Sequence, residues 1–320
     1  MFHFGIYPGG MSGTENGLTN GPANNPSKIL EALEALQGDA PCFIIRAYAG
    51  YKGIDHPVTT TPENPSRYVI NGRCLDLVLC FQSNDIDLYG WKTFIKQQVE
   101  KYRHQLRYLQ VTEEANVNLP NLDGYFASSR RALVDGVVYA KSLIERMGLD
   151  VQIGFNATPD FNPDRMFWKE IRSLATNEFY ESLGYVGLDF FPDVFRPLPR
   201  EGNKILVDEP IRQVIKHFRE DIRDAGIIND IPLHISENGW PTNSSRLETD
   251  QSNILESIIR RVYELRSEFN IQTYELFDLR DADSTSEDIF YRFGIMHDDY
   301  SPKISFETYR KLIRELSTAH

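Results

Sequence analysis

Short apolar runs alternate with longer amphipathic segments along the 320 residues of the chain. The short runs have the length and composition of buried strands, and the longer segments repeat apolar residues at helical spacing. Eight of the short runs predict strands, at 2–7, 42–48, 75–81, 108–114, 151–156, 186–191, 232–237 and 274–278.

The segments between these strands predict helices. One begins at the capping pair Pro26-Ser27, and another, 123–147, stops at Gly148, a residue that often ends helices. The segment 61–71 is the weakest helix prediction because it contains two prolines. The remaining helices are expected at about 89–105, 163–183, 209–225, 249–269 and 302–316.

Strict alternation of eight strand–helix units predicts a closed parallel (β/α)8 barrel, the TIM-barrel fold, as a single domain over residues 1–320. An open doubly wound sheet is the alternative. Its phosphate-binding turn would lead directly into a helix, whereas the glycine-rich stretch 9–13 leads into more loop. In a barrel the loops after the strands carry the site, and loops 8–25, 49–73 and 280–301 are long enough to wall a cleft.

Composition narrows the classes of function. A net charge of −12 argues against nucleic acid and anionic membranes as partners, and it suits a neutral substrate such as a carbohydrate. The chain shows neither a leader peptide nor an apolar run long enough to span a membrane, so a cytoplasmic protein is expected. Cys42, Cys74 and Cys80 lie in strand-like runs without metal-ligand spacing and are expected to be buried. We therefore predict no metal and no cofactor; oligomeric state stays open.

The phrase His-Ile-Ser-Glu-Asn-Gly-Trp-Pro at 234–241 ends the seventh predicted strand with a carboxylate, Glu237, and places Trp240 beside it. A sugar-cleaving site needs a charged oxygen nucleophile and a flat apolar surface together. The fourth predicted strand also ends in carboxylates, Glu113 and Glu114. Side-chain alternation along that strand favours Glu114 over Glu113 as the group that faces into the barrel.

The seventh-strand phrase and the sequence Glu113-Glu114-Ala115-Asn116 resemble the clan A glycoside hydrolases, a large group of retaining (β/α)8 enzymes. The resemblance implies that Glu237 is the nucleophile and Glu114 the acid/base. Phrases at 292–296 and 300–303 also resemble the clan, so the likeness covers the whole chain. The chain departs from the clan at two points: Glu113 replaces the usual Asn, and Phe277 or Tyr274 stands in for the usual eighth-strand Trp.

Double displacement explains why two carboxyl groups are needed. One attacks the anomeric carbon as a carboxylate, and the other, about 5–5.5 Å away, first donates a proton to the leaving oxygen. Arg46 follows the apolar run of the second strand and is the candidate that keeps Glu237 ionised, with Glu113 as further support. Other strand-end groups are expected to contact substrate, namely Tyr7, Tyr48, Asn116, Asn156, Asp189, Trp240, Phe277 and Asp278.

Two alternatives stay open. A metal-dependent barrel enzyme of the amidohydrolase type would need His-x-His on the first strand, where only His3 stands. A glycosidase-like barrel that binds a glycan or a protein partner without hydrolysis would explain the missing Asn and Trp. The favoured hypothesis is a retaining O-glycoside hydrolase acting on a neutral or amino-sugar glycoside, with sugar, linkage and endo or exo action left open.

Overall fold

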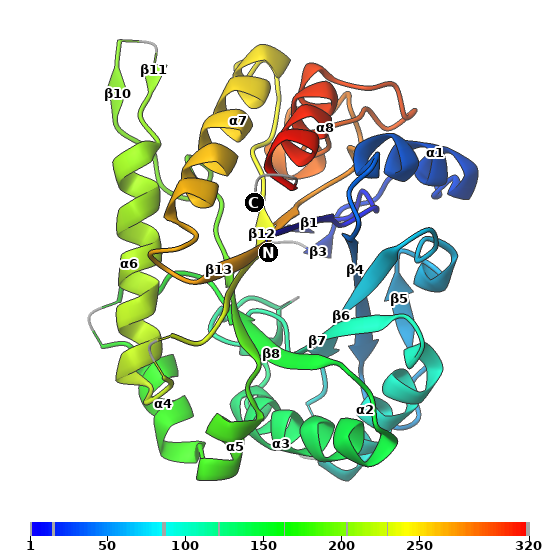
Figure 1. Cartoon of the computed structure of the whole chain (residues 1–320), viewed down its shortest axis with the longest axis vertical. Coiled ribbons are helices and arrows are strands. Elements are labelled where there is room, and N and C mark those ends of the chain that lie inside the picture. Colours follow the sequence, from blue (N-terminus) through cyan, green and yellow to red (C-terminus); the bar gives the residue numbers. More distant parts are fainter. Residues whose placement is uncertain are drawn as a thin grey trace.

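The computed structural model describes residues 2–14, 17–84, 88–120, 122–162, 164–202, 204–228 and 230–317. Eight parallel strands form a barrel, which closes because the first strand pairs with both the second and the eighth (Figure 1). The predicted (β/α)8 fold is thus confirmed. In chain order the strands are β1 (His3–Ile6), β4 (Phe43–Tyr51), β6 (Arg73–Phe81), β7 (Leu106–Val111), β8 (Gln152–Ala157), β9 (Tyr185–Asp189), β12 (Leu233–Asn238) and β13 (Ile271–Leu276).

Helices surround the barrel, as Figure 1 shows. The described α-helices are α1 (Pro26–Gln37), α2 (Leu88–Tyr102), α3 (Ser129–Met147), α4 (Met166–Leu174), α5 (Asn177–Ser182), α6 (Asp208–Asp224), α7 (Glu248–Leu265) and α8 (Ile304–Ser317).

Three helix predictions are wrong in detail. The predicted helix 123–147 becomes α-helical only at Ser129, after a 3-10 turn at Asp123–Tyr125. The segment 163–183 forms α4 and α5, because Ala175 adopts extended backbone and the Thr176 side chain then caps a new helix by accepting from Phe179 N–H. The segment 61–71 contains only a 3-10 turn, Pro65–Arg67, preceded by the short strand β5 (Thr59–Thr61), which pairs antiparallel with β4. Its two prolines, one of them opening the 3-10 turn, are incompatible with the interior of an α-helix.

The barrel separates an apolar layer from a partly polar interior. Leucines, isoleucines and valines of the strands pack outward against the helices, for example Leu77 and Leu109. The interior holds polar groups that bond across strands: Arg46 of β4 contacts Asp76 of β6 and Gln110 of β7. Part of the interior is apolar, where Ile44, Tyr108 and Tyr185 pack together, and the Arg46 network forms a polar part of it.

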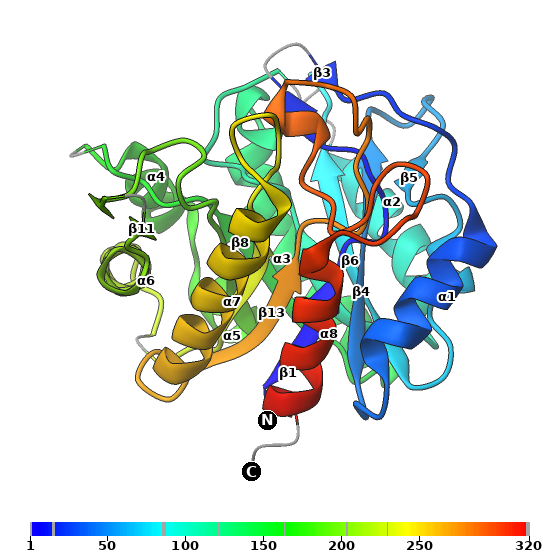
Figure 2. The same ribbon diagram turned by 90° about the horizontal axis from the view of Figure 1, so that it is seen from above.

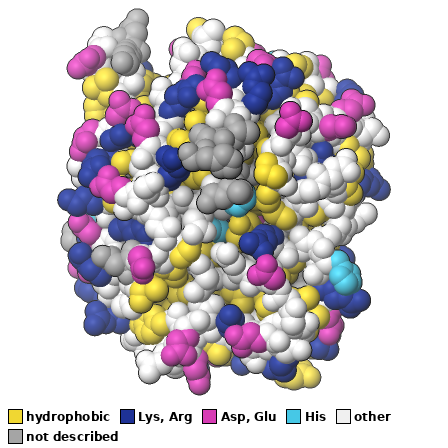
Figure 3. Space-filling model, in the orientation of Figure 1, with side chains coloured by type: hydrophobic (Ala, Val, Ile, Leu, Met, Phe, Trp, Pro, Cys, Tyr) yellow, Lys and Arg dark blue, Asp and Glu magenta, His cyan; other side chains and the backbone are white. Residues whose placement is uncertain are grey.

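All eight strands point to one end of the molecule. Figure 2 shows both termini at the opposite end, and β3 (Gly17–Leu18) at the end where the strands finish. In the face that Figure 3 shows, acidic and basic side chains are interspersed. Within the described ranges, no helix combines the length and the apolar character that crossing a bilayer would require.

One glycine sets how closely α3 approaches the strand that carries Glu113. A Cβ atom on Gly136 would lie 2.8 Å from Trp91 Nε1, 2.8 Å from Val111 Cγ1 and 3.3 Å from Ile95 Cδ1. Trp91 is fully buried and donates to Ala132 C=O, so it has little freedom to move. The helix thus lies against the last residue of β7 at a distance that only glycine permits.

We predict that Gly136→Ala destabilises the protein although alanine favours helix by about 1 kcal/mol. Overpacking typically costs about 1–3 kcal/mol, so a fall of a few degrees in Tm is expected by calorimetry. Gly13→Ala is the control, because a Cβ there meets nothing within 4 Å. A higher Tm for Gly136→Ala would show that the close contact does not constrain the helix.

Candidate active site

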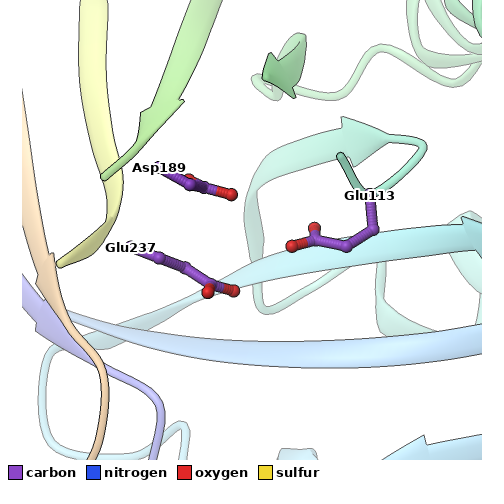
Figure 4. Close-up of side chains that lie close together, drawn as sticks. All are labelled: Glu113, Asp189 and Glu237. Carbon is purple, nitrogen blue, oxygen red and sulfur yellow. The ribbon is translucent and has the colours of Figure 1, made fainter. Parts of the chain in front are cut away.

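Three carboxyl groups converge at the end of the barrel where the strands finish. Glu113 follows β7, Asp189 ends β9 and Glu237 is the penultimate residue of β12. Each offers an oxygen within 4.8 Å of the oxygens of the other two, and Figure 4 shows the side chains pointing toward one another. Relative exposures are 7% for Glu113, 0% for Asp189 and 7% for Glu237, so the cluster lies almost out of water.

Arg46 is the cation beside this cluster. Its Nη1 donates to Asp76 Oδ2 at 2.7 Å, and its Nη2 donates to Gln110 Oε1 at 3.0 Å and Glu113 Oε2 at 3.4 Å. Its Nε lies 3.5 Å from Glu237 Oε1. The planar guanidinium therefore joins four strands, and the sequence-based prediction that Arg46 lies beside Glu237 agrees with this geometry.

Tyr48, two residues further along β4, completes the surroundings of Glu237. The Tyr48 hydroxyl donates to Glu237 Oε1 and accepts from Arg46 Nε at 2.9 Å. Arg46 and Tyr48 lie on the same face of β4 because side chains alternate along a strand. Glu237 thus has a cation and a hydroxyl donor on the same oxygen.

The fourth-strand acids are arranged differently from the expectation of simple alternation. Gln110 faces inward as predicted, but Thr112 adopts a left-handed backbone with φ of 70°. The chain therefore turns Glu113 inward as well, where its Oε2 accepts from Gln110 at 2.6 Å and from Asn156 at 3.2 Å. The prediction that Glu114, and not Glu113, faces into the barrel is therefore wrong in one respect, because Glu113 is the acid that contacts Arg46.

Asp123, which the sequence did not single out, fixes this turn. Its Oδ2 accepts from Glu113 N–H at 2.9 Å and from Phe81 N–H at 2.6 Å, so it ties the end of β7 to the end of β6. Burial raises the pKa of Asp123 to about 7, against the two backbone donors, which lower it. In the sequence Asp123 had the features of an ordinary helix start, and no local signal marked its long-range partners.

An irregularity in β12 brings Glu237 inward in a comparable way. Ile235 pairs with Leu188 and Glu237 with Asp189, so β12 has one extra residue between the two pairs. The extra residue, Ser236, lies against Gly187, where a Cβ would be only 2.1 Å from its Oγ. The bulge and the missing side chain at Gly187 together make room for Glu237 next to Asp189.

Glu114 borders a pocket at the rim of the barrel. Its backbone φ is 43°, and its N–H donates to Asn156 Oδ1 at 2.8 Å. Its side chain is half-buried and, together with Asp189, lines a cavity of about 490 Å³. The two adjacent acids therefore have separate surroundings, one among hydrogen-bond donors and one beside an apolar wall.

Burial and mutual repulsion favour the neutral form of several of these acids. Desolvation, then the charge of Glu237, raises the pKa of Glu113 well above its usual range, against the opposing effect of Arg46. Desolvation, then Glu113 and Glu237, does the same to the pKa of Glu114. The pKa of Asp189 is raised by burial and by Glu237. These three carboxyl groups therefore hold a proton to higher pH than a free carboxyl group does.

An aromatic cluster, defined as Tyr7, Tyr48, Phe277 and Phe293, stands beside Glu237. Tyr7 stacks on Phe277 with ring centroids 5.4 Å apart and meets the Tyr48 ring edge-on at 5.2 Å. The Tyr7 hydroxyl is bonded to Thr61 Oγ1 at 2.5 Å, and Phe277 is 7% exposed. The predicted substrate contacts Tyr7, Tyr48 and Phe277 therefore lie together. Asp278 follows Phe277, is buried, and has its pKa raised by desolvation and by Asp281.

Three predicted substrate contacts instead have structural surroundings. Trp240 is 2% exposed and the Arg246 guanidinium lies 3.9 Å from its ring centroid, so the ring offers no free face to a sugar. The Asn116 amide bonds to Thr158 through both its nitrogen and its oxygen. Asn156 is fully buried and orients the acids of the site. Protein neighbours cover these three side chains, because proximity in sequence to an acid does not determine what packs on a side chain. Contact with substrate stays a prediction for them.

The carboxylate cluster also resembles the donor set of a hard cation, since Mg²⁺ and Ca²⁺ take carboxylate oxygens. Arg46 already provides positive charge within 3.5 Å of two of the three members, Glu113 and Glu237. A divalent ion would be repelled by that charge. We therefore interpret the cluster as acids organised around a guanidinium, and the geometry alone assigns no ion to it.

No protein-family model matches the chain, and no curated protein matches it by sequence. Solved structures share its fold. It is similar to a family 39 glycoside hydrolase from the gut symbiont Bacteroides cellulosilyticus WH2, with TM-score 0.62 and 12% identity over 99% of this chain and 64% of that one. It is also similar to the GH39 enzyme from Xanthomonas axonopodis pv. citri, with TM-score 0.59 and 13% identity over 97% of this chain and 65% of that one.

The third comparison is a β-glucosidase from Thermotoga maritima in complex with castanospermine, with TM-score 0.62 and 13% identity over 92% of this chain and 87% of that one. The chain thus spans slightly less than two thirds of the two family 39 chains. At these identities the likeness establishes the shared fold. The resemblance to (β/α)8 glycoside hydrolases that the sequence predicted is confirmed at that level, with no family within the group assigned.

We predict that Glu113→Gln stabilises the protein increasingly as pH rises. The folded-state pKa of Glu113 is raised, so wild-type stability falls as pH climbs from the unfolded value, about 4.3, through the folded value. Glutamine does not titrate and can still accept from Gln110. The Tm gain should therefore be largest at pH 8 and vanish near pH 4.

Thermal melts between pH 4 and pH 8 test this, with Glu34→Gln on the exposed side of α1 as the control. A Tm gain that does not depend on pH would mean that folding does not raise the pKa of Glu113. A Tm loss that deepens toward pH 8 would mean that Glu113 is ionised and stabilising in the folded protein.

Proposed function

We propose that the protein is a retaining O-glycoside hydrolase with Glu237 as the nucleophile and Glu114 as the acid/base. One observation carries this proposal: Glu237 ends the seventh barrel strand with Arg46 and Tyr48 on one of its oxygens and two further carboxyl groups within 4.8 Å. The fold it shares with glycoside hydrolases of families 39 and 1, including a β-glucosidase, supports the same reaction class.

Glu237 has the surroundings that a carboxylate nucleophile needs. Arg46 and Tyr48 both contact Oε1, which leaves Oε2 as the oxygen for attack on the anomeric carbon. Arg46 places a positive charge beside this carboxylate, and the carboxylate is the form that acts as a nucleophile. When the covalent glycosyl-enzyme forms, Glu237 becomes a neutral ester. Its Oε1 is then the carbonyl oxygen of the ester, and the Tyr48 hydroxyl can keep its hydrogen bond to that oxygen.

Glu114 has the surroundings of a proton donor. A carboxyl group against an apolar wall keeps its proton to higher pH, which is the pattern by which paired acids in glycosidases divide their roles. In the first step Glu114 gives its proton to the leaving oxygen as the glycosidic bond breaks. In the second step its carboxylate takes a proton from water, which attacks the anomeric carbon and releases Glu237.

Glu113 is proposed as a binding group and not as a second base. Its raised pKa favours the neutral carboxyl, which can donate one hydrogen bond to the sugar. In the clan that the sequence resembles, an Asn amide stands at this position and holds the 2-hydroxyl. A neutral Glu113 can replace that donor for a hydroxyl, and an ionised Glu113 would pair with an amino group, so neutral and amino sugars are both proposed substrates.

The alternative is a barrel that binds a glycan or protein partner without hydrolysis. It is favoured by the buried Trp240 ring, which removes the sugar platform that was expected at the site. This alternative gives no role to Glu114, the acid beside an apolar wall, or to Glu237, the acid that contacts Arg46. A panel of nitrophenyl glycosides separates the two hypotheses, because binding without release of nitrophenol would support the alternative.

We predict that Glu237→Gln lowers kcat at least ~1,000-fold on whichever nitrophenyl glycoside the wild type cleaves, because the nucleophile is lost. Circular dichroism and melting should show a folded protein. The matched control is Glu248→Gln, a partly exposed acid at the start of α7, which should keep wild-type kcat. A 2-fluoro glycoside of the cleaved sugar should label Glu237 covalently in the wild type. Labelling of Glu113 or Glu114 would refute the role assignment.

We predict that Glu114→Ala harms substrates in proportion to their need for protonation. Glycosylation with an alkyl leaving group should slow about 10²–10⁴-fold, whereas a dinitrophenyl leaving group, which departs as a stable anion, should show little loss in that step. Pre-steady-state release of the leaving group measures the step directly. Glu113→Ala is the control and should affect both substrates alike. The reverse pattern would make Glu113 the acid.

A further inference from the structure

The pocket beside Glu114 is built from apolar side chains. It has a volume of about 490 Å³ and lies between the loops that follow β7, β8 and β9 and the first turns of α6. Most of its lining is hydrocarbon, contributed mainly by Leu122, Phe190, Phe191, Phe195, Ile211 and Val214. Such a cavity gains free energy by enclosing apolar groups. Its polar lining, from Glu114, Thr158, Asp160, Asn162, Asp189 and Arg196, is the smaller part, so most hydroxyls of a sugar ring would face hydrocarbon.

The pocket meets the catalytic carboxyl groups at one end. Glu114 and Asp189 both belong to its wall, and Asp189 is also a member of the central cluster with Glu113 and Glu237. Two other lining residues are exposed, Phe195 at 68% and Leu119 at 39%, so the lining continues to the surface. The pocket therefore leads from the reacting groups to solvent along an apolar path.

The direction of proton transfer identifies what occupies it. An acid/base group must lie within hydrogen-bond reach of the leaving oxygen, so the leaving group lies on the Glu114 side of the scissile bond. The apolar pocket begins at that side. A second sugar ring placed there would bury hydroxyls among phenylalanines and prolines, at a cost of about 1–3 kcal/mol for each unpaired group.

We propose that the substrates are glycosides of apolar alcohols, alkyl or aryl, whose aglycone fills the pocket lined by Phe191, Phe195 and Val214. This inference rests on the proposed function, because it takes Glu114 as the group that protonates the leaving oxygen. It assigns the pocket to the leaving alcohol and leaves the sugar ring to the aromatic cluster and Glu113. Disaccharides and longer glycans are then poor substrates.

Binding to an inactive variant tests the pocket without requiring turnover. Methyl, butyl and octyl β-glucosides, kept below micelle concentration, are titrated calorimetrically into Glu237→Gln. Each methylene that enters the pocket should tighten Kd about threefold, until the pocket is filled. The octyl glucoside should then bind at least about 100-fold more tightly than the methyl glucoside. Equal affinity across the series would overturn the proposal.

Two pairs of variants locate the effect. Val214→Asn and Phe195→Ser, each made in the Glu237→Gln background, should remove at least about tenfold of the octyl preference and leave methyl glucoside binding unchanged. Their controls, Ile228→Asn and Tyr89→Ser, alter exposed apolar residues outside the pocket and should keep the preference. Phe195 is mostly exposed, so its variant remains informative if Val214→Asn does not fold. An octyl preference that neither pocket variant reduces would place the alkyl chain elsewhere and refute the assignment.

Turnover by the wild type separates failure of this inference from failure of the proposed function. Cleavage of octyl glycoside with a higher kcat/KM than methyl glycoside or a disaccharide of the same sugar supports both. Cleavage of the disaccharide in preference to the alkyl glycosides keeps the hydrolase and overturns the apolar aglycone. Chain-length-dependent binding without cleavage of any glycoside keeps the pocket and overturns the hydrolase.

Discussion

The guanidinium of Arg46 is the interaction on which the site depends. It is 1% exposed and contacts acids or amides from β6, β7 and β12 while it belongs to β4. A charge so deeply buried must be compensated, and the carboxylates in turn would repel one another without it. Because the fork is planar and rigid, it also fixes the distances among its partners. Arg46 contacts groups from three other strands, so a change in the register of any of these strands would change the geometry of the site.

More acidic than basic groups lie around Arg46, and this excess of acid suits the proposed reaction. Five buried carboxyl groups surround one guanidinium: Asp76, Glu113, Asp189, Glu237 and Glu275. Burial raises the pKa of Glu113, Asp189 and Glu275. Their neutral, protonated forms are therefore favoured, and these forms need no cation to balance them. A hydrolase that works by double displacement needs a neutral acid close to an ionised one. An excess of buried acids around one cation raises the pKa of several of them, which suits the proposed reaction.

Periodicity predicts the barrel, and strand-end position places Glu237 and Arg46 at its mouth, because each of these depends on a pattern within a single strand. The features that the sequence did not reveal depend on contacts between distant segments. Alternation failed at Glu113 because Thr112 has a positive φ, which Asp123 supports from ten residues away. Trp240 had the sequence context of a sugar platform, but Arg246 covers it. Contacts of this kind, in which a residue of one loop packs on a side chain of another segment, leave no periodic pattern in a single sequence.

The same backbone irregularity serves both fourth-strand acids. In a regular strand Glu113 and Glu114 would point to opposite faces, one into the barrel and one toward the helices. Left-handed backbone at Thr112 and Glu114 costs roughly 1–2 kcal/mol per residue. Hydrogen bonds from Glu113 N–H to Asp123 and from Glu114 N–H to Asn156 hold this conformation. The strain lets adjacent acids face the barrel mouth together, one toward the guanidinium and one toward the apolar pocket. Their chemistry can therefore differ although their positions in the sequence do not.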